Sequence, residues 1–379
     1  MRSPEVSILT SIGTVCPALK TLCISSKFDS LKGSGKMLDV RGEKILSEAL
    51  LYLPALQSLS CPAIDESAII HLSHLPFLAD LSLKLRVDLQ LERLRPFLAP
   101  PAFASVNSLT LHTTSLSTLT SLFEPMHFKP TTVSFVVTAT PTPDAVRLFF
   151  LAFASACSPE QLSRISLITS GERQRDAAPQ RITLHTLQSL LVFPNIHMFE
   201  FDVPCDIALD DAAITALAKY WPNLNILSLN ADSGWGIKSQ VTHKGLITFL
   251  ARCPSLNEFA LAVDLFDIDK PRVDMAGWRP GDGASNTKCV MAHFVTSTIV
   301  HPITIAAFLS GVCPELEAVK STWCQDELET EVDAEEVEVY RERWEEVEIL
   351  LPAFSAVRKQ CMEWTQRTIK QESATPAPA

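Results

Sequence analysis

Apolar residues recur along the chain in a pattern that predicts a series of short strands. In each copy they are spaced L-x-x-L-x-L and usually follow a proline, as in Pro222 with Leu224, Leu227 and Leu229. Ten successive copies are present, and their first apolar positions are residues 19, 56, 78, 106, 132, 162, 196, 224, 256 and 316. One copy is weak evidence, because any buried strand could supply it. Ten in succession predict a stacked array of similar units.

The segments between these strands read as amphipathic helices, because their apolar residues are three or four positions apart. Residues 44–53 form one such segment. Asp65, Asp210 and Thr242 stand at the starts of three others, where their side-chain oxygens can cap a helix. The proline that follows most helices then ends the helix and turns the chain into the next strand.

The helix–strand unit predicts the fold class α/β, a leucine-rich-repeat solenoid or horseshoe. Parallel strands are expected on the concave face and helices on the convex face, because one unit cannot bury its apolar side alone. The solenoid of about ten irregular repeats is expected over residues 1–325, with a long insertion at 264–288. An acidic helical C-terminal cap is expected at 326–370, interrupted at Pro352, and a disordered tail at 371–379.

Charge and cysteine content narrow the function classes. The net charge is -11, and residues 326–348 carry twelve acidic side chains against Arg341 and Arg343. The rest of the chain is nearly neutral, so it lacks the basic surface that nucleic-acid binding needs. The ten cysteines form no C-x-x-C pair. Cys16, Cys157, Cys253 and Cys313 are expected to fill helix ends as reduced thiols, in the cytoplasm or nucleus. No apolar run reaches bilayer length, so no membrane contact is expected.

Motifs that could carry catalysis are incomplete. Residues 33–36 read Gly-Ser-Gly-Lys, but a phosphate-binding loop also needs an earlier glycine and a following hydroxyl, where Ser30 and Met37 stand. His71 and His74 share a helix face without further metal-ligand spacing. We therefore expect no enzyme, no catalytic residue, no metal and no cofactor.

The helix–proline–strand unit with cysteines at helix ends resembles the leucine-rich repeats of F-box proteins, especially the large sets found in mushroom-forming (basidiomycete) fungi. The resemblance covers roughly residues 5–365. It implies the substrate-recognition arm of a Skp–cullin–F-box ubiquitin ligase. The chain enters its first repeat within ten residues, without a preceding F-box segment. The expectation is therefore either a receptor whose F-box lies upstream, which would bind a Skp-type adaptor, or a stand-alone binding module.

Side chains between and just after the last two apolar positions of each strand are expected on the concave face, where they would contact a protein ligand. The charged or larger polar ones are Asp80, Lys84, His112, Arg164, Glu200, Asp202, Asn230 and Glu258. Their neighbours are small and polar, and the acidic side chains of Glu200, Asp202 and Glu258 suggest that the ligand segment is basic. An ordinary solvated sheet face is the alternative for each residue.

Two loops add candidate contacts. The insertion at 264–288 contains Trp278 near Arg272 and Arg279, and a shorter loop carries Trp235 between two glycines. An aromatic side chain close to arginine is typical of binding hot spots. The alternative is that each tryptophan folds back onto the repeats.

A different function class remains open at the sequence level. One family of GTPase-activating proteins pairs leucine-rich repeats with an acidic tail. Its repeats carry asparagine three positions after the last anchor, whereas the corresponding residues here are Lys27, Ile64, Arg86 and Asp232. The pattern therefore favours the binding scaffold over the GTPase activator, and leaves the identity of the bound protein open.

Overall fold

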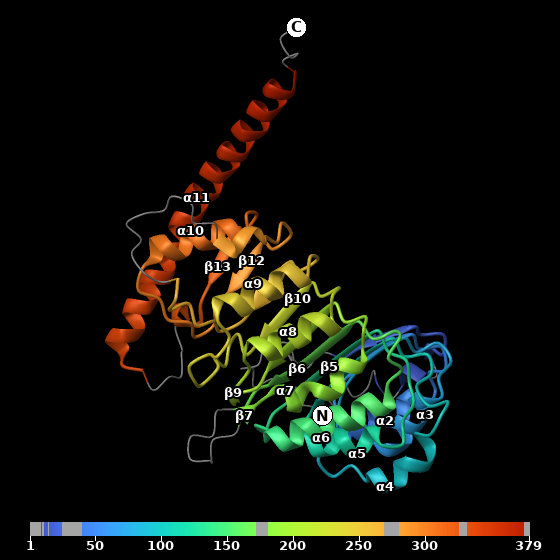
Figure 1. Cartoon of the computed structure of the whole chain (residues 1–379). Coiled ribbons are helices and arrows are strands. Elements are labelled where there is room, and N and C mark those ends of the chain that lie inside the picture. The colour runs from blue at the N-terminus through green and yellow to red at the C-terminus, as the bar shows by residue number, and fades with distance from the viewer. Residues whose placement is uncertain are drawn as a thin grey trace. The chain divides into compact units, whose positions relative to one another are not determined.

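The computed structural model describes residues 9, 11–13, 15–24, 40–171, 181–268, 280–325 and 332–374. The chain divides into two compact units, Met1–Cys205 and Asp206–Ala379. Both contain parallel strands alternating with helices (Figure 1). The α/β fold class predicted from the repeat pattern is therefore confirmed.

Seven parallel strands form the sheet of the first unit, and their spatial order follows the chain. They are β1 (Thr21–Cys23), β2 (Ser58–Cys61), β3 (Asp80–Lys84), β4 (Ser108–Thr113), β5 (Thr132–Val137), β6 (Arg164–Thr169) and β8 (Met198–Asp202). The helices between them are α2 (Val40–Leu50), α3 (Glu66–Ser73), α4 (Leu91–Leu94), α5 (Leu116–Phe123), α6 (Pro143–Ala156) and α7 (Leu184–Leu187). Shorter elements are β7 (Arg181–Ile182) and the 3-10 helices η1 (Arg95–Phe97) and η2 (Gln188–Val192).

The second unit repeats the scheme with four parallel strands, again in chain order. They are β10 (Ile226–Leu229), β11 (Glu258–Ala260), β12 (Met291–His293) and β13 (Ala318–Lys320). Its helices are α8 (Asp211–Tyr220), α9 (His243–Arg252), α10 (Pro302–Val312) and α11 (Ala334–Ala374). The remaining elements are β9 (Asp206–Ile207), η3 (Pro280–Gly283) and η4 (Thr322–Cys324).

The strand register explains why the apolar spacing of the sequence produces a core. Middle anchors of successive strands pair directly with one another across the first sheet. This row is Leu59, Leu81, Leu109, Val133, Ile165 and Phe199, each at most 4% exposed. Since side chains alternate along a strand, the intervening polar residues point to the other face. Helices α5 and α6 pack side by side, and so do α8 and α9 in the second unit (Figure 1).

An aromatic cluster forms the densest part of the first unit's core. Phe135 of β5 lies 5.0 Å from Phe149 of α6 between ring centroids, and 5.7 Å from Phe123 of α5. Phe153 joins the same cluster at 5.6 Å from Phe135. All four rings are fully buried, so this helix–strand junction is a major source of stability for the unit.

Three helix starts predicted from the sequence are confirmed. Asp65 accepts a hydrogen bond from the Ala68 N–H at the start of α3. Asp210 does the same for Ala213 in α8, and Thr242, the residue before α9, accepts from the Lys244 N–H. Each cap satisfies a helix N–H that would otherwise lack a partner within the helix. Among the described helices, none combines the length and apolar character required to span a bilayer.

One strand was missed in the gap between residues 256 and 316. Strand β12 pairs with β11 on one side and β13 on the other. Its apolar positions are Cys289, Ala292 and Phe294, all fully buried. They have the L-x-x-L-x-L spacing, but cysteine and alanine stand where the other copies carry larger aliphatic residues. The described residues therefore hold eleven strands of this type instead of ten.

Two expectations about the C-terminal region were wrong. Pro352 does not interrupt the C-terminal helix, since α11 runs from Ala334 to Ala374 with the proline inside it. Leu351 before the proline is buried, and Arg358 after it donates hydrogen bonds to Ser310 and Ala307 of α10; these contacts offset the lost backbone hydrogen bond. Residues 371–374, expected in a disordered tail, belong to this helix, and 375–379 lie outside the described residues.

The cysteines at helix ends are buried in three of the four predicted cases. Cys157, Cys253 and Cys313 follow the last residues of α6, α9 and α10. Burial raises the pKa of the Cys253 thiol to about 12 and also raises that of Cys157. Cys16 is exposed, contrary to the prediction, because it precedes β1, the edge strand of the first sheet.

Candidate protein-binding face

The side chains opposite the buried apolar row form three parallel rows across one face of the first unit's sheet, and one flanking row includes the apolar Val136 and Ile168. The middle row consists of Ser60, Ser82, Thr110, Ser134 and Ser166, paired in register from β2 to β6. We call these five residues the hydroxyl row. Neighbouring strands are about 4.8 Å apart, so the row spans about 19 Å. It presents hydroxyl donors and acceptors on short side chains, which leaves the face open to a partner's larger groups.

The hydroxyl row ends at a carboxylate. Ser166 is in register with Glu200 of β8, and its Oγ donates a hydrogen bond of 2.7 Å to Glu200 Oε2. Glu200 is half-buried, and Asp202 of the same strand is only 8% exposed. The β8 end of the face is therefore acidic, and a positively charged ligand group would find complementary charge there.

The other predicted residues of the first unit lie in the two flanking rows. Asp80 and Arg164 are exposed members of one row, but strands β4 and β5 lie between them, so three strand spacings, about 14 Å, separate the two residues. They do not pair with each other. Lys84 and His112 are register neighbours in the other row and are both half-buried. All six predicted residues of this unit thus lie on one face, as the alternation of the strands requires.

Of the second-unit candidates that the structure describes, only Glu258 lies on the polar side of a strand with part of its side chain exposed. Asn230 and Trp235 are both fully buried, so neither can contact a ligand directly in this structure. Their assignment as protein-binding residues was wrong. The sequence pattern placed Asn230 one step past a strand and Trp235 in a glycine-rich loop, where exposure is the usual outcome.

Hydrogen bonds explain why this loop folds inward. Asn230 takes a left-handed backbone conformation, φ 51°, and its Nδ2 donates to the Gly234 carbonyl at 3.1 Å. Gly234 and Gly236 both have a φ of 70°, which reverses the chain around Trp235. The Trp235 indole Nε1 then donates to the Leu229 carbonyl at 2.8 Å. The tryptophan therefore closes the end of β10 instead of projecting outward.

Arg272, Trp278 and Arg279 lie outside the described residues, which resume at Pro280. The part of the insertion that is described contains η3 and the buried Asn286, whose Nδ2 donates to the Cys253 carbonyl at 2.8 Å. These described residues connect β12 to the preceding repeat.

Sequence reasoning missed the residues that β12 places on the second unit's polar strand face. Met291 and His293 are both half-exposed, and His293 is in register with Ala260 and Lys320. Burial lowers the pKa of His293 to about 4. Its Nδ1 accepts a hydrogen bond of 3.1 Å from the Val295 N–H, so this nitrogen is held unprotonated. The Cys289–Ala292–Phe294 spacing was the signal that could have revealed them.

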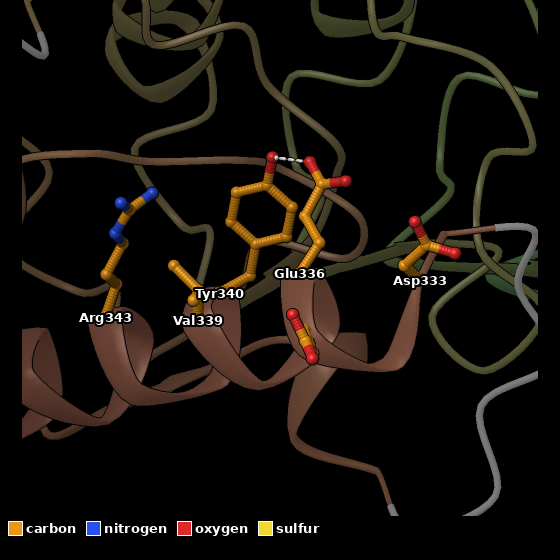
Figure 2. A pocket seen from close by; sticks show the side chains of 6 residues that line it. Asp333, Glu336, Val339, Tyr340 and Arg343 are labelled. Carbon is orange, nitrogen blue, oxygen red and sulfur yellow. Dashed lines mark hydrogen bonds between the residues drawn. The ribbon is translucent and has the colours of Figure 1, made fainter.

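A shallow hollow at the start of α11 is lined by acidic and aromatic groups (Figure 2). Its lining residues are Asp333, Glu335, Glu336, Val339, Tyr340 and Arg343. The Tyr340 hydroxyl donates a 2.5 Å hydrogen bond to Glu336, which raises the tyrosine pKa. Arg343 lies over the Tyr340 ring and donates to the Ile299 carbonyl at 2.7 Å. Arg343, through this bond, and Tyr340, through its ring contact with Trp323, attach α11 to its unit, whereas Asp333, Glu335, Glu336 and Val339 are exposed.

In the described parts of the chain, no three His, Cys, Asp or Glu side chains gather in a way that could hold a metal ion. The chain matches no known family model, and no curated protein shows significant similarity to it. A functional assignment therefore depends on the geometry of the sheet face.

Proposed function

We propose that this protein is a binding scaffold whose first unit holds a protein ligand on the face of the hydroxyl row. The observation that carries the proposal is the register of that row. Four half-exposed hydroxyl side chains from consecutive parallel strands form one continuous polar surface, and the buried Ser166 joins this surface to the carboxylate of Glu200. A large, ordered surface of this kind suits recognition of a macromolecule better than enclosure of a small molecule.

We further propose that the parallel strands belong to a leucine-rich-repeat solenoid with the hydroxyl row on its concave side. The chain-order pairing of the strands and the helix in nearly every connection support this. In such an array each repeat buries its apolar side against the next, and the polar faces of the strands add up to one binding surface. The ligand class is a protein segment, with basic groups placed near Glu200 and Asp202.

The biological setting that fits best is substrate recognition for an F-box-type ubiquitin ligase, in the cytoplasm or nucleus. The support is the repeat pattern of the sequence. The structure also contains no disulfide among the cysteines that it describes, which suits a reducing compartment. Stable co-purification of a Skp-type adaptor with the full-length natural protein would support the ligase role. If no adaptor co-purifies, the protein is a stand-alone binding module.

A pair of serine variants tests the binding face. Ser134→Arg places a long charged side chain in the middle of the hydroxyl row, where Ser134 is half-exposed. Ser155→Arg makes the same change on the exposed surface of α6, away from the strand face. Affinity capture with quantitative mass spectrometry identifies proteins retained by the wild-type chain, and titration then measures their dissociation constants.

We expect a true ligand to bind Ser155→Arg like wild type and to bind Ser134→Arg at least roughly tenfold more weakly. Circular dichroism verifies that both variants fold. Equal retention of every captured protein by the two variants would contradict the assignment of this face.

A further inference from the structure

Helix α11 is long, and its charge changes sign along its length. Its 41 residues span about 60 Å. Residues 334–351 contain seven glutamates and two arginines, whereas residues 352–367 contain Arg358, Lys359 and Arg367 against Glu363. The helix thus has an acidic first half and a basic second half. Two such helices running antiparallel would place opposite charges side by side.

The first half of α11 is packed onto the second unit. Trp344, Val347 and Leu351 are at most 1% exposed. The Trp344 ring stacks on Phe294 with 4.8 Å between centroids, and its Nε1 donates to the Ser297 carbonyl at 2.9 Å. One face of this half is therefore fully used for attachment.

Attachment by polar groups continues as far as residue 359. Arg358 donates to Ser310 Oγ and to the Ala307 carbonyl, both at 2.8 Å. Lys359 forms an ion pair of 2.8 Å with Glu315. Figure 1 shows the remainder of α11, drawn in red, continuing as a single helix beyond these contacts.

A second apolar stripe begins near the middle of α11 and continues along its distal half, beside the attached face. It consists of Leu350, Phe354, Val357, Cys361 and Trp364, which we call the distal seam. The spacing of four, three, four and three residues is that of a coiled-coil seam. Val357 is 57% exposed and Trp364 is 65% exposed, while Cys361 is also exposed. A large aromatic side chain in this position is typical of a protein interface.

We infer that the distal seam pairs with the distal seam of a second copy of this chain, in antiparallel orientation. The seam is nearly symmetric about Val357, so that Leu350 of one copy meets Trp364 of the other and Phe354 meets Cys361. The same alignment brings Glu346 of one copy to within one residue of Arg367 of the other. Both of these side chains are exposed.

Charge decides between the two possible directions of pairing. A parallel pair would place the acidic halves together and the basic halves together, whereas the antiparallel pair joins acidic to basic twice. This self-association lies outside the proposed ligand face, and it does not depend on that proposal. It would make the scaffold bivalent, with two hydroxyl rows in one dimer.

The first test measures the molar mass of the full-length chain by light scattering and sedimentation at several concentrations. We expect a dimer for wild type and a monomer for Val357→Glu with Trp364→Glu. Ala356→Glu is the matched control, because neighbouring helix residues are about 100° apart and Ala356 is exposed away from the seam. A monomeric wild type at all concentrations would overturn the inference.

Charge exchange tests the orientation. Arg367→Glu and Glu346→Arg should each weaken dimerisation roughly threefold to tenfold, because each creates two like-charge contacts in the dimer. The double variant restores both pairs with reversed sign and should recover most of the lost affinity. Additive losses in the double variant would contradict antiparallel pairing.

Cross-linking gives an independent measure of register. In the antiparallel dimer Val357→Cys, in a Cys361→Ser background, brings two thiols together, and mild oxidation by copper phenanthroline and oxygen should join them. Native Cys361 faces residue 353 of the other copy, about 12 Å along the axis from its counterpart, too far for a disulfide. Efficient Cys361 cross-linking in wild type, lost in Cys361→Ser, would show parallel pairing and refute the proposal.

Discussion

The aromatic cluster of the first unit allows a sharp test of how its core is stabilised. Phe135 is fully buried and contacts three other phenylalanine rings within 5.7 Å between centroids. Replacing it by alanine removes the ring but leaves α5 and α6 attached at their other contacts. The remaining cavity cannot collapse completely, because strands on both sides hold β5 in place.

The magnitude follows from burial and from the ring contacts. Replacing a buried phenylalanine by alanine costs about 3–5 kcal/mol of unfolding free energy, which includes the cavity left behind. For a unit of the size of Met1–Cys205, each kcal/mol lowers the melting temperature by about 2–4 °C. We therefore expect Phe135→Ala to lower the melting temperature of the first unit by about 6–20 °C.

Far-UV circular dichroism is the appropriate assay, because all six tryptophans follow residue 205 and their fluorescence reports on the second unit. Phe77→Ala is the matched control. Its ring is 63% exposed, so the same chemical change should alter the melting temperature by no more than about 2 °C. Equal shifts for the two variants would refute the argument that the buried cluster, and not phenylalanine content as such, stabilises the unit.

Three further outcomes are expected. A Cβ added at Gly245 would clash with Asp211 Oδ1, which accepts a hydrogen bond from the Thr242 N–H. Gly245→Ala should therefore lower the unfolding free energy of the second unit by about 1–3 kcal/mol in urea titrations followed by tryptophan fluorescence, and unchanged stability would contradict the contact. Because the pKa of His293 is lowered to about 4, its contribution to the unfolding free energy is complete above pH 6.5 and is lost as the pH falls from 6.5 towards 4. His293→Gln should therefore flatten the dependence of the unfolding free energy on pH, whereas the exposed His185→Gln should leave that dependence unchanged. Thiol titration of the native protein should detect the four exposed cysteines rapidly and the six buried ones only after unfolding, and uniform reactivity would be inconsistent with the packing.

The sequence by itself determined the elements of the repeat. Apolar spacing located ten of the eleven principal strands, because a strand with one buried side must alternate apolar and polar residues. Asp65, Asp210 and Thr242 marked helix starts, since a helix needs acceptors for its first N–H groups. The strand missed at residues 291–293 failed the same rule only because cysteine and alanine provide a weaker apolar signal than leucine.

Only the tertiary structure decided which polar and aromatic side chains reach the surface. Asn230 and Trp235 looked like ligand contacts, but two glycines with positive φ and a hydrogen bond to Leu229 turn the loop inward. Contacts on both sides of Pro352 keep α11 continuous, although the local sequence predicts a break. The hydroxyl row likewise exists only through strand register, which joins residues far apart in the chain. Local spacing specifies which side of its own strand or helix a residue occupies, whereas burial and neighbours depend on segments that the spacing does not contain.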